Sequence, residues 1–185
     1  MVWKYLLLGE YMQIIKRYSS YSVVLLALVF SFLASANAQE TSKIEVLADS
    51  ALTKVVPTSF YFAGQSAETQ IRNTAAAKLG KDRLVLAGLV DTSGYSTDIS
   101  GKYEGFFITD SPIKIGTKTL GIGAYGFGFA KGGMLNIFDI SSKLILSTAS
   151  KTDPLMKRPR PLQMIVGDKG VRFYKGKDYV VITRK

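Results

Sequence analysis

The sequence predicts a single all-β domain, a mostly antiparallel β-sandwich or small β-barrel of about eight to ten strands. Short runs of β-branched and aromatic residues recur along the chain, and glycine-containing turns separate them. In one stretch Tyr125, Phe127 and Phe129 alternate with Gly126 and Gly128, which is the period of an extended chain. No segment shows a long helical period, so the fold class follows from the strands alone.

A cleaved signal peptide is expected before this domain, over residues 1–38. A basic pair precedes an apolar run of about 12 residues, from Val23 to Ala34, and an Ala-x-Ala cleavage site follows that ends at Ala38. The run is shorter than the roughly 20 residues that span a bilayer, so no membrane span is expected after processing. We therefore predict a periplasmic or extracellular protein with a mature domain over residues 39–185; a start at Met12 would give a more ordinary leader.

The strands of the first half are predicted from alternation and from turn residues. The run from Arg83 to Val90 is almost entirely apolar and is bounded by turns, which indicates a strand buried on both faces. We expect further strands at 44–47, 52–56, 59–63 and 103–109.

The segment from Ala67 to Leu79 fits two structures. Apolar residues recur every four positions, as on one face of a helix, but polar residues also alternate with Ile71, as in a strand. Because Asn73 and Thr74 would weaken a helix at its centre, we favour extended structure.

The stretch from Gly116 to Ala130 is predicted to form one β-hairpin with the short strand 113–115. Residues 116–119 have turn chemistry, and the second strand would carry rings on one face and bare backbone on the other. Gly121, Gly123 and Gly126 match the dinucleotide-binding fingerprint by letter, but that motif must open a helix, and here a strand continues. The glycines are instead expected to let a large side chain or another backbone come close. Further strands are expected at 134–140, 144–148, 162–166, 171–174 and 179–183.

The chain contains neither histidine nor cysteine. This composition excludes histidine-based triads, thiol nucleophiles, disulfides and the usual zinc and copper sites, so no metal or cofactor is expected. Only carboxylates, lysine, tyrosine and hydroxyls remain for proton transfer. A carboxylate pair could be drawn from Asp91, Asp98, Glu104 and Asp110, but no spacing singles out two of them. The composition therefore points away from catalysis without excluding a carboxylate-based hydrolase.

A net charge of +10 favours an anionic partner, such as a component of the cell envelope. The basic residues cluster locally at Lys157, Arg158 and Arg160, between two prolines, which gives a candidate anion-binding loop. The cluster lacks interleaved aromatic residues that would stack on bases, so nucleic acid is not expected as a partner.

If the domain has a ligand pocket, tyrosines are the rings that offer both an apolar body and a hydroxyl. Gln70 and Arg72 would share one face of an extended segment and supply polar groups. The candidate ligand-binding residues are therefore Gln70, Arg72, Tyr61, Tyr95, Tyr103 and Tyr125.

Residues 62–67, 86–95 and 123–127 together resemble a group of exported bacterial hypothetical proteins. The pattern Gly-x-x-Leu-x-x-Gly-x-Tyr-Gly of bacterial β proteins of unknown function is also similar to this chain, through Leu120, Gly123, Tyr125 and Gly126. The resemblance implies an exported all-β domain and transfers no activity. We expect a non-catalytic binding module for a small apolar, aromatic or anionic envelope ligand. A structural envelope protein without a ligand and a carboxylate-based hydrolase are the alternatives.

Overall fold

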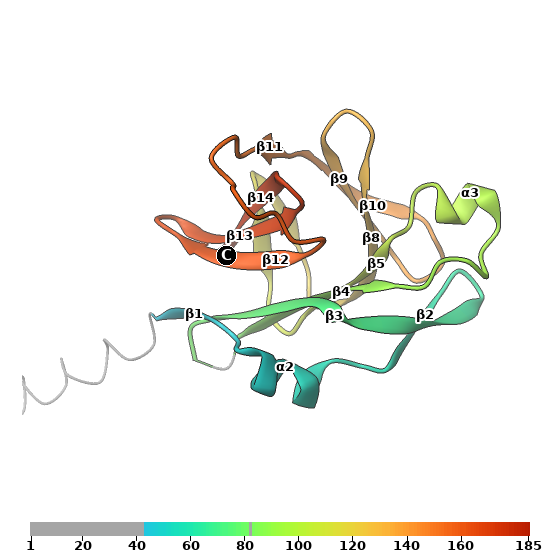
Figure 1. Ribbon diagram of the computed structural model, residues 1–185, viewed down its shortest axis with the longest axis horizontal. Coiled ribbons are helices and arrows are strands. Elements are labelled where there is room, and N and C mark those ends of the chain that lie inside the picture. The colour runs from blue at the N-terminus through green and yellow to red at the C-terminus, as the bar shows by residue number, and fades with distance from the viewer. Residues whose placement is uncertain (1–42, 82) are drawn as a thin grey trace, which may run out of the picture. The chain divides into compact units, whose positions relative to one another are not determined.

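The computed structural model describes residues 43–81 and 83–185, which form two antiparallel β-sheets (Figure 1). The larger sheet contains β1 (Ile44–Val46), β2 (Ser59–Phe62), β3 (Gln65–Leu79), β4 (Leu84–Val90), β5 (Gly105–Thr109), β8 (Gly123–Ala130), β9 (Met134–Phe138) and β10 (Leu144–Ala149). The smaller sheet contains β6 (Ile113–Ile115), β7 (Lys118–Leu120), β11 (Lys151–Thr152), β12 (Gln163–Gly167), β13 (Gly170–Lys175) and β14 (Asp178–Arg184). The predicted leader lies outside the described residues.

The all-β prediction is confirmed, and the two sheets form a sandwich that is not closed into a barrel. The larger sheet runs in the order β1-β3-β4-β5-β8-β9-β10, with β2 paired to β3. The smaller sheet runs β12-β13-β14-β6-β7, with β11 paired to β14. The described residues contain 14 strands, more than expected, because several have only two or three residues. In the same part of the chain, no helix is long and apolar enough to cross a bilayer.

The inner faces of the two sheets enclose the main hydrophobic core. Phe107 and Phe127 from the larger sheet meet Phe173 from the smaller one, with ring centroids 5.7 and 5.4 Å from the Phe173 centroid and edge-to-face orientations. Such tilted ring pairs stabilise a core beyond the burial of their area. Phe127 is the central ring of the alternating stretch that the sequence singled out.

A second core covers the outer face of the larger sheet. The helix α2 (Asp49–Val55) and the segment 91–104 cover this face (Figure 1). The strand β2, which pairs with the first residues of β3, contributes Phe60 and Phe62 to the same core. Phe62 stacks on Tyr103 here, with ring centroids 3.9 Å apart. The segment 91–104 also contains the short helix α3 (Thr97–Ser100).

Two of the predicted elements differ in the structure. The predicted strand 52–56 is wrong: its residues belong to α2 and its end, where Leu52 and Val56, four positions apart, both reach the outer core. The predicted single hairpin is also wrong. β6 turns tightly at Gly116, with φ of +61°, and pairs with β7, whereas β8 joins the larger sheet between β5 and β9. The chain changes sheets at residues 121–122, within the stretch that we expected to be continuous.

The remaining ambiguous segment is extended, as favoured. β3 covers the whole of 67–79 and is a single strand of 15 residues. Its pairing with β4 shifts register between Thr69 and Thr74, so residues 70–73 bulge out of the ladder. β4 lies between β3 and β5 and is largely buried on both faces, as its apolar run predicted.

The glycines of β8 allow close approach, as predicted. A Cβ atom on Gly126 would overlap the ring of Phe62, and one on Gly128 would overlap the backbone carbonyl of Lys102. Tyr125, Phe127 and Phe129 occupy the opposite face and contribute to or pack against the main core. Of the fingerprint-like glycines, Gly126 therefore serves packing, and the chain continues through it as a strand.

We predict that Gly126→Ala lowers the free energy of unfolding by about 1–3 kcal/mol, because the new methyl group forces the buried Phe62 ring to move. Gly94→Ala is the matched control. Its Cβ would meet no atom within 4 Å, so the change should stay within about 0.5 kcal/mol. Chemical denaturation of both variants measures the difference; equal stabilities would contradict the close packing on β8.

Candidate functional site

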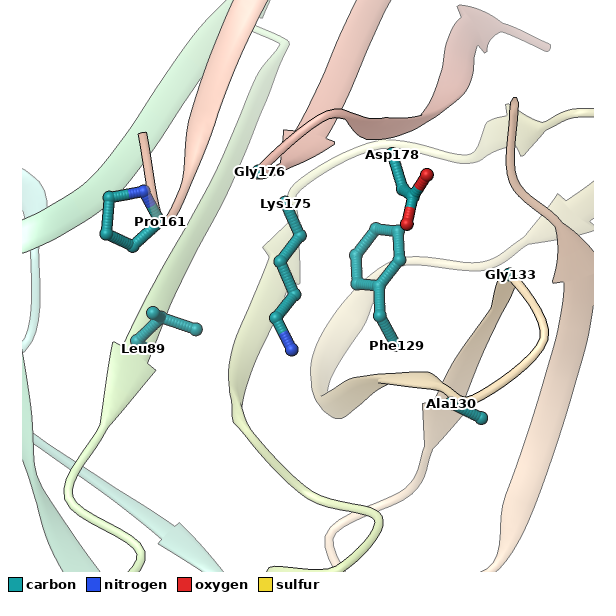
Figure 2. Close-up of a pocket in the computed structure, with 8 residues that line it drawn as sticks. All are labelled: Leu89, Phe129, Ala130, Gly133, Pro161, Lys175, Gly176 and Asp178. Carbon is teal, nitrogen blue, oxygen red and sulfur yellow. The ribbon is translucent and has the colours of Figure 1, made fainter. Parts of the chain in front are cut away.

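An open cleft lies at one end of the sandwich, where strands of the larger sheet face the turn between β13 and β14. Its volume is about 320 Å³, within the range of small-molecule sites. Figure 2 shows the Lys175 side chain projecting between Leu89 and Phe129. The lining residues are Leu89, Phe129, Ala130, Gly133, Pro161, Lys175, Gly176 and Asp178.

Strand alternation explains why charged side chains lie in this cleft. On β13, Val171 and Phe173 point into the main core, and Lys175 is the next residue on that inward face. On β14, Val180 and Ile182 point inward, and Asp178 continues their row. Lys175 and Asp178 are direct partners in the β13–β14 register. The inward faces of both strands therefore end in charges at the open end of the core.

The Lys175 ammonium forms an ion pair with a carboxylate from the larger sheet. Its Nζ contacts Oε1 of Glu104, the residue just before β5. The Phe129 N–H donates to Oε2 of the same carboxylate at 2.9 Å, so both oxygens of Glu104 are engaged. The Lys175 and Glu104 side chains are 34% and 27% exposed, so the pair is reachable from solvent.

The other charged group of the cleft is also held in place. Thr152 Oγ1, on β11, donates to Oδ1 of Asp178 at 2.6 Å. A lysine ammonium has three donor hydrogens, and Glu104 Oε1 uses one of them. The cleft therefore combines apolar walls, from Leu89, Phe129 and Pro161, with a fixed cation that has donors to spare. This arrangement suits an apolar or aromatic molecule that carries a carboxylate or a similar anionic group.

Three of the four candidate tyrosines belong to the two cores and the fourth is exposed, and none of them lines the cleft. Tyr95 and Tyr103 are buried in the outer core, with ring centroids 5.3 Å apart. Tyr61, on β2, is 55% exposed. Tyr125 packs against the main core and donates to the carbonyls of residues 121 and 122, at 3.2 Å each. Their role in ligand binding stays a prediction.

Buried tyrosines of the outer core differ in how their hydroxyls are satisfied. The Tyr95 hydroxyl donates to the Gln65 carbonyl at 3.0 Å. The Tyr103 hydroxyl is fully buried and has no hydrogen-bond partner within the described ranges. Burial raises the pKa of Tyr103 well above its usual range, with a smaller contribution from Tyr95. Tyr103 is therefore neutral at all physiological pH values and acts as a packing group.

Gln70 and Arg72 both lie in the β3 bulge, at exposed positions. Gln70 Nε2 donates to the Val90 carbonyl at 3.1 Å, and Asn73 Nδ2 donates to Gln70 Oε1 at 2.8 Å. Gln70 thus closes the bulge against β4. Neither side chain lines the cleft, and their predicted ligand contacts stay untested.

The basic cluster Lys157, Arg158 and Arg160 is exposed in the loop between β11 and β12. The Arg160 carbonyl accepts from the Gly176 N–H at 3.0 Å, which places the end of this loop beside the cleft. The three side chains do not line the cleft, and anion binding by them stays a prediction.

Of the acids considered for catalysis, only Glu104 belongs to the cleft, through Lys175. Asp91 accepts from the Ser93 N–H at 3.0 Å in an exposed turn, and this hydrogen bond lowers the pKa of Asp91. Asp110 accepts from the Leu84 N–H at 2.7 Å, and Asp98 is exposed in α3. Asp91 thus holds a turn and Asp110 the start of β4. Within residues 43–81 and 83–185 no group of three or more acids could hold a metal ion.

The sequence analysis missed Lys175, Asp178 and Leu89. A usable signal was present: Val171-x-Phe173-x-Lys175 and Asp178-x-Val180-x-Ile182 each put a charge at an inward position of an apolar row. Glu104 had been considered as an acid, but its partner comes from a strand 71 residues away in sequence.

We predict that Tyr95→Phe lowers the free energy of unfolding by about 1 kcal/mol, because the hydrogen bond to the Gln65 carbonyl is lost. Tyr103→Phe should leave stability unchanged or raise it, since the removed hydroxyl has no partner in the described part of the chain. Denaturant unfolding of the two variants compares them directly. A larger loss for Tyr103→Phe would contradict this description of the outer core.

We predict that Glu104→Ala lowers the free energy of unfolding by about 1–3 kcal/mol, because the Phe129 N–H and the Lys175 ammonium both lose their acceptor. Glu68→Ala removes an exposed carboxylate from β3 and serves as the control, with an expected change within about 0.5 kcal/mol. Thermal unfolding at matched ionic strength checks both. A loss that disappears in high salt would indicate that only surface electrostatics is involved.

No family model matches this chain, and no curated protein or solved structure matches it either. What the cleft can bind is therefore argued from the charges, volume and packing of its own residues.

Proposed function

We propose that this chain is an exported, non-catalytic binding module that holds a small molecule with an apolar or aromatic body and an anionic group. The site is the cleft between the sheets, and the ligand's anionic group contacts Lys175. The observation that carries the proposal is a lysine at an inward strand position, with its side chain about one-third exposed, inside a cleft of about 320 Å³. Export rests on the predicted signal peptide over residues 1–38 and on the resemblance to exported bacterial proteins.

The walls of the cleft support an apolar body for the ligand. Leu89 and Phe129 are partly buried side chains that pack against the main core. Pro161 lies beside Leu89, and Phe129 lies on the other side of Lys175 (Figure 2). A ligand that covers them removes apolar area from water, which contributes about 25 cal/mol for each Å². A small number of fixed polar groups within apolar walls is the usual composition of ligand sites.

The engagement of Glu104 favours a positioning role for this acid over proton transfer. Both Glu104 oxygens accept hydrogen bonds, and Asp178 accepts one from Thr152. A general acid or base needs an oxygen free to exchange a proton with the substrate. Glu104 therefore orients the lysine, and Asp178 links β14 to β11 through one of its two oxygens.

The ion pair also preorganises the lysine for an anionic group. Glu104 holds the Lys175 side chain in the cleft before a ligand arrives, so less side-chain entropy is lost on binding. An anionic ligand accepts hydrogen bonds from the remaining N–H groups of the Lys175 ammonium. Asp178 also lines the cleft, so the position of the ligand's anionic group is set by the free N–H donors of Lys175 and lies away from that carboxylate.

We predict that aromatic carboxylates such as benzoate and phenylacetate raise the melting temperature of the protein, whereas benzamide does not. A ligand at 100 times its dissociation constant stabilises the fold by about 2.7 kcal/mol. Lys175→Met and the cleft-filling variant Leu89→Trp should both abolish the effect. Lys177→Met, which removes an exposed lysine from the same turn, should retain it.

Extracts of cell envelope, followed by mass spectrometry of bound material, extend this screen to unknown ligands. If no anionic compound changes the melting temperature, or if Lys177→Met loses as much as Lys175→Met, the binding proposal fails. The structural envelope protein without a ligand then becomes the better interpretation.

A further inference from the structure

A second hollow, of about 210 Å³, lies at the turn between β12 and β13, and we call it the turn groove. None of its residues lines the cleft described above. It contains three cationic side chains and one acid, in contrast to the apolar cleft. Its lining residues are Lys151, Gly167, Asp168, Lys169, Gly170, Arg172, Tyr179 and Val181.

The strand register brings the groove's residues together from separate parts of the chain. Arg172, on β13, is the direct partner of Val181 on β14, and Lys151, on β11, is the partner of Tyr179. Arg172 alternates with the inward residues Val171 and Phe173, so it belongs to the outward face of the smaller sheet. The groove therefore lies on the face of the smaller sheet that points away from the main core.

The Arg172 side chain is held by its neighbours. Its guanidinium lies over the Tyr179 ring, 5.3 Å from the centroid, which is a cation–π contact. Its Nε lies against Gly167, where a Cβ atom would approach within 3.1 Å. The glycine leaves room for the arginine, and the tyrosine orients it. Arginine held in this way presents a planar fork of donors that matches two oxygens of an oxyanion.

The charges of the groove favour an anion. Lys151, Lys169 and Arg172 carry three positive charges, and Asp168 carries one negative charge. Lys151 and Lys169 are exposed at the rim, where they can add single contacts to an oxyanion held by Arg172.

We infer that the turn groove binds a tetrahedral oxyanion of the phosphate class, with Arg172 as the bidentate contact and Lys151 and Lys169 as charge contacts. The group is either inorganic phosphate or the phosphate ester of a lipid headgroup, because the same chemistry recognises both. This site is independent of the proposed cleft, so Lys175→Met should bind phosphate as the unaltered protein does.

The first arm of the test is a titration with inorganic phosphate, followed by NMR of the backbone amides. Saturable shifts are expected for the amides of residues 167–172. Arg172→Gln should weaken binding by about tenfold or more, the effect of losing a charge-assisted hydrogen bond. Asp168→Asn should tighten binding, because it removes the groove's only acid.

Control variants distinguish phosphate binding in the turn groove from non-specific attraction of phosphate to the positively charged protein. Lys54→Gln removes an exposed lysine from α2, and the combined change of Lys157, Arg158 and Arg160 to Gln removes the loop cluster. Both should leave the phosphate shifts unchanged. If Arg172→Gln fails to fold, the double variant Lys151→Gln, Lys169→Gln tests the same groove through exposed side chains.

The second arm uses phosphatidylcholine vesicles with and without phosphatidic acid. Binding that requires phosphatidic acid and is lost in Arg172→Gln, without binding of free phosphate, assigns the site to lipid headgroups. Binding of free phosphate with the same sensitivity assigns it to the soluble ion. The inference is overturned if neither probe binds, or if Lys54→Gln weakens binding as much as Arg172→Gln.

Discussion

The structure depends on the burial of both faces of the larger sheet. Its central strands, β4, β5 and β8, have the smaller sheet on one side and the outer core on the other. A strand buried twice cannot alternate apolar and polar residues, and here β8 alternates rings with glycines instead. The rings fill the main core, and the glycines allow Phe62 and the Lys102 carbonyl to lie directly on the strand. The chain has no cysteine and so no disulfides, and close packing on both faces of the larger sheet stabilises the fold.

The cleft forms at the end of the sandwich where the inward rows of β13 and β14 extend beyond the packed core. The inward rows of β13 and β14 reach past the packed rings at Lys175 and Asp178, where water has access. Burial of an ion pair costs desolvation energy, so charges at inward positions are tolerated best where exposure is partial. Glu104 reaches the pair because it directly precedes β5, at the same end of the larger sheet. At this end of the main core, Lys175 is therefore fixed by Glu104 beside the apolar walls of the cleft.

Both hollows join residues from strands that are separate in the sequence. The cleft joins β4, β8 and the β13–β14 turn, and the turn groove joins β11, β13 and β14. In each, a basic side chain is oriented by a partner that holds it in place: Glu104 for Lys175 and Tyr179 for Arg172. Preorganised charges of this kind bind with a smaller loss of side-chain entropy than free surface lysines.

The sequence by itself determined the fold class, most strand positions and the packing role of the β8 glycines. These depend on local alternation and on the absence of a side chain, which can be read along one segment. It did not determine that residues 52–56 form the end of a helix, because Leu52 and Val56, four positions apart, share a face in a strand as well as in a helix. The helix is favoured only because both side chains pack into the outer core. Nor did it show that the chain changes sheets at residues 121–122, since both halves of that stretch are good strands. Only the tertiary structure decided which strands face each other, and it thereby placed Glu104 on Lys175. That contact joins positions 71 residues apart, and no local pattern encodes a pairing at such a distance.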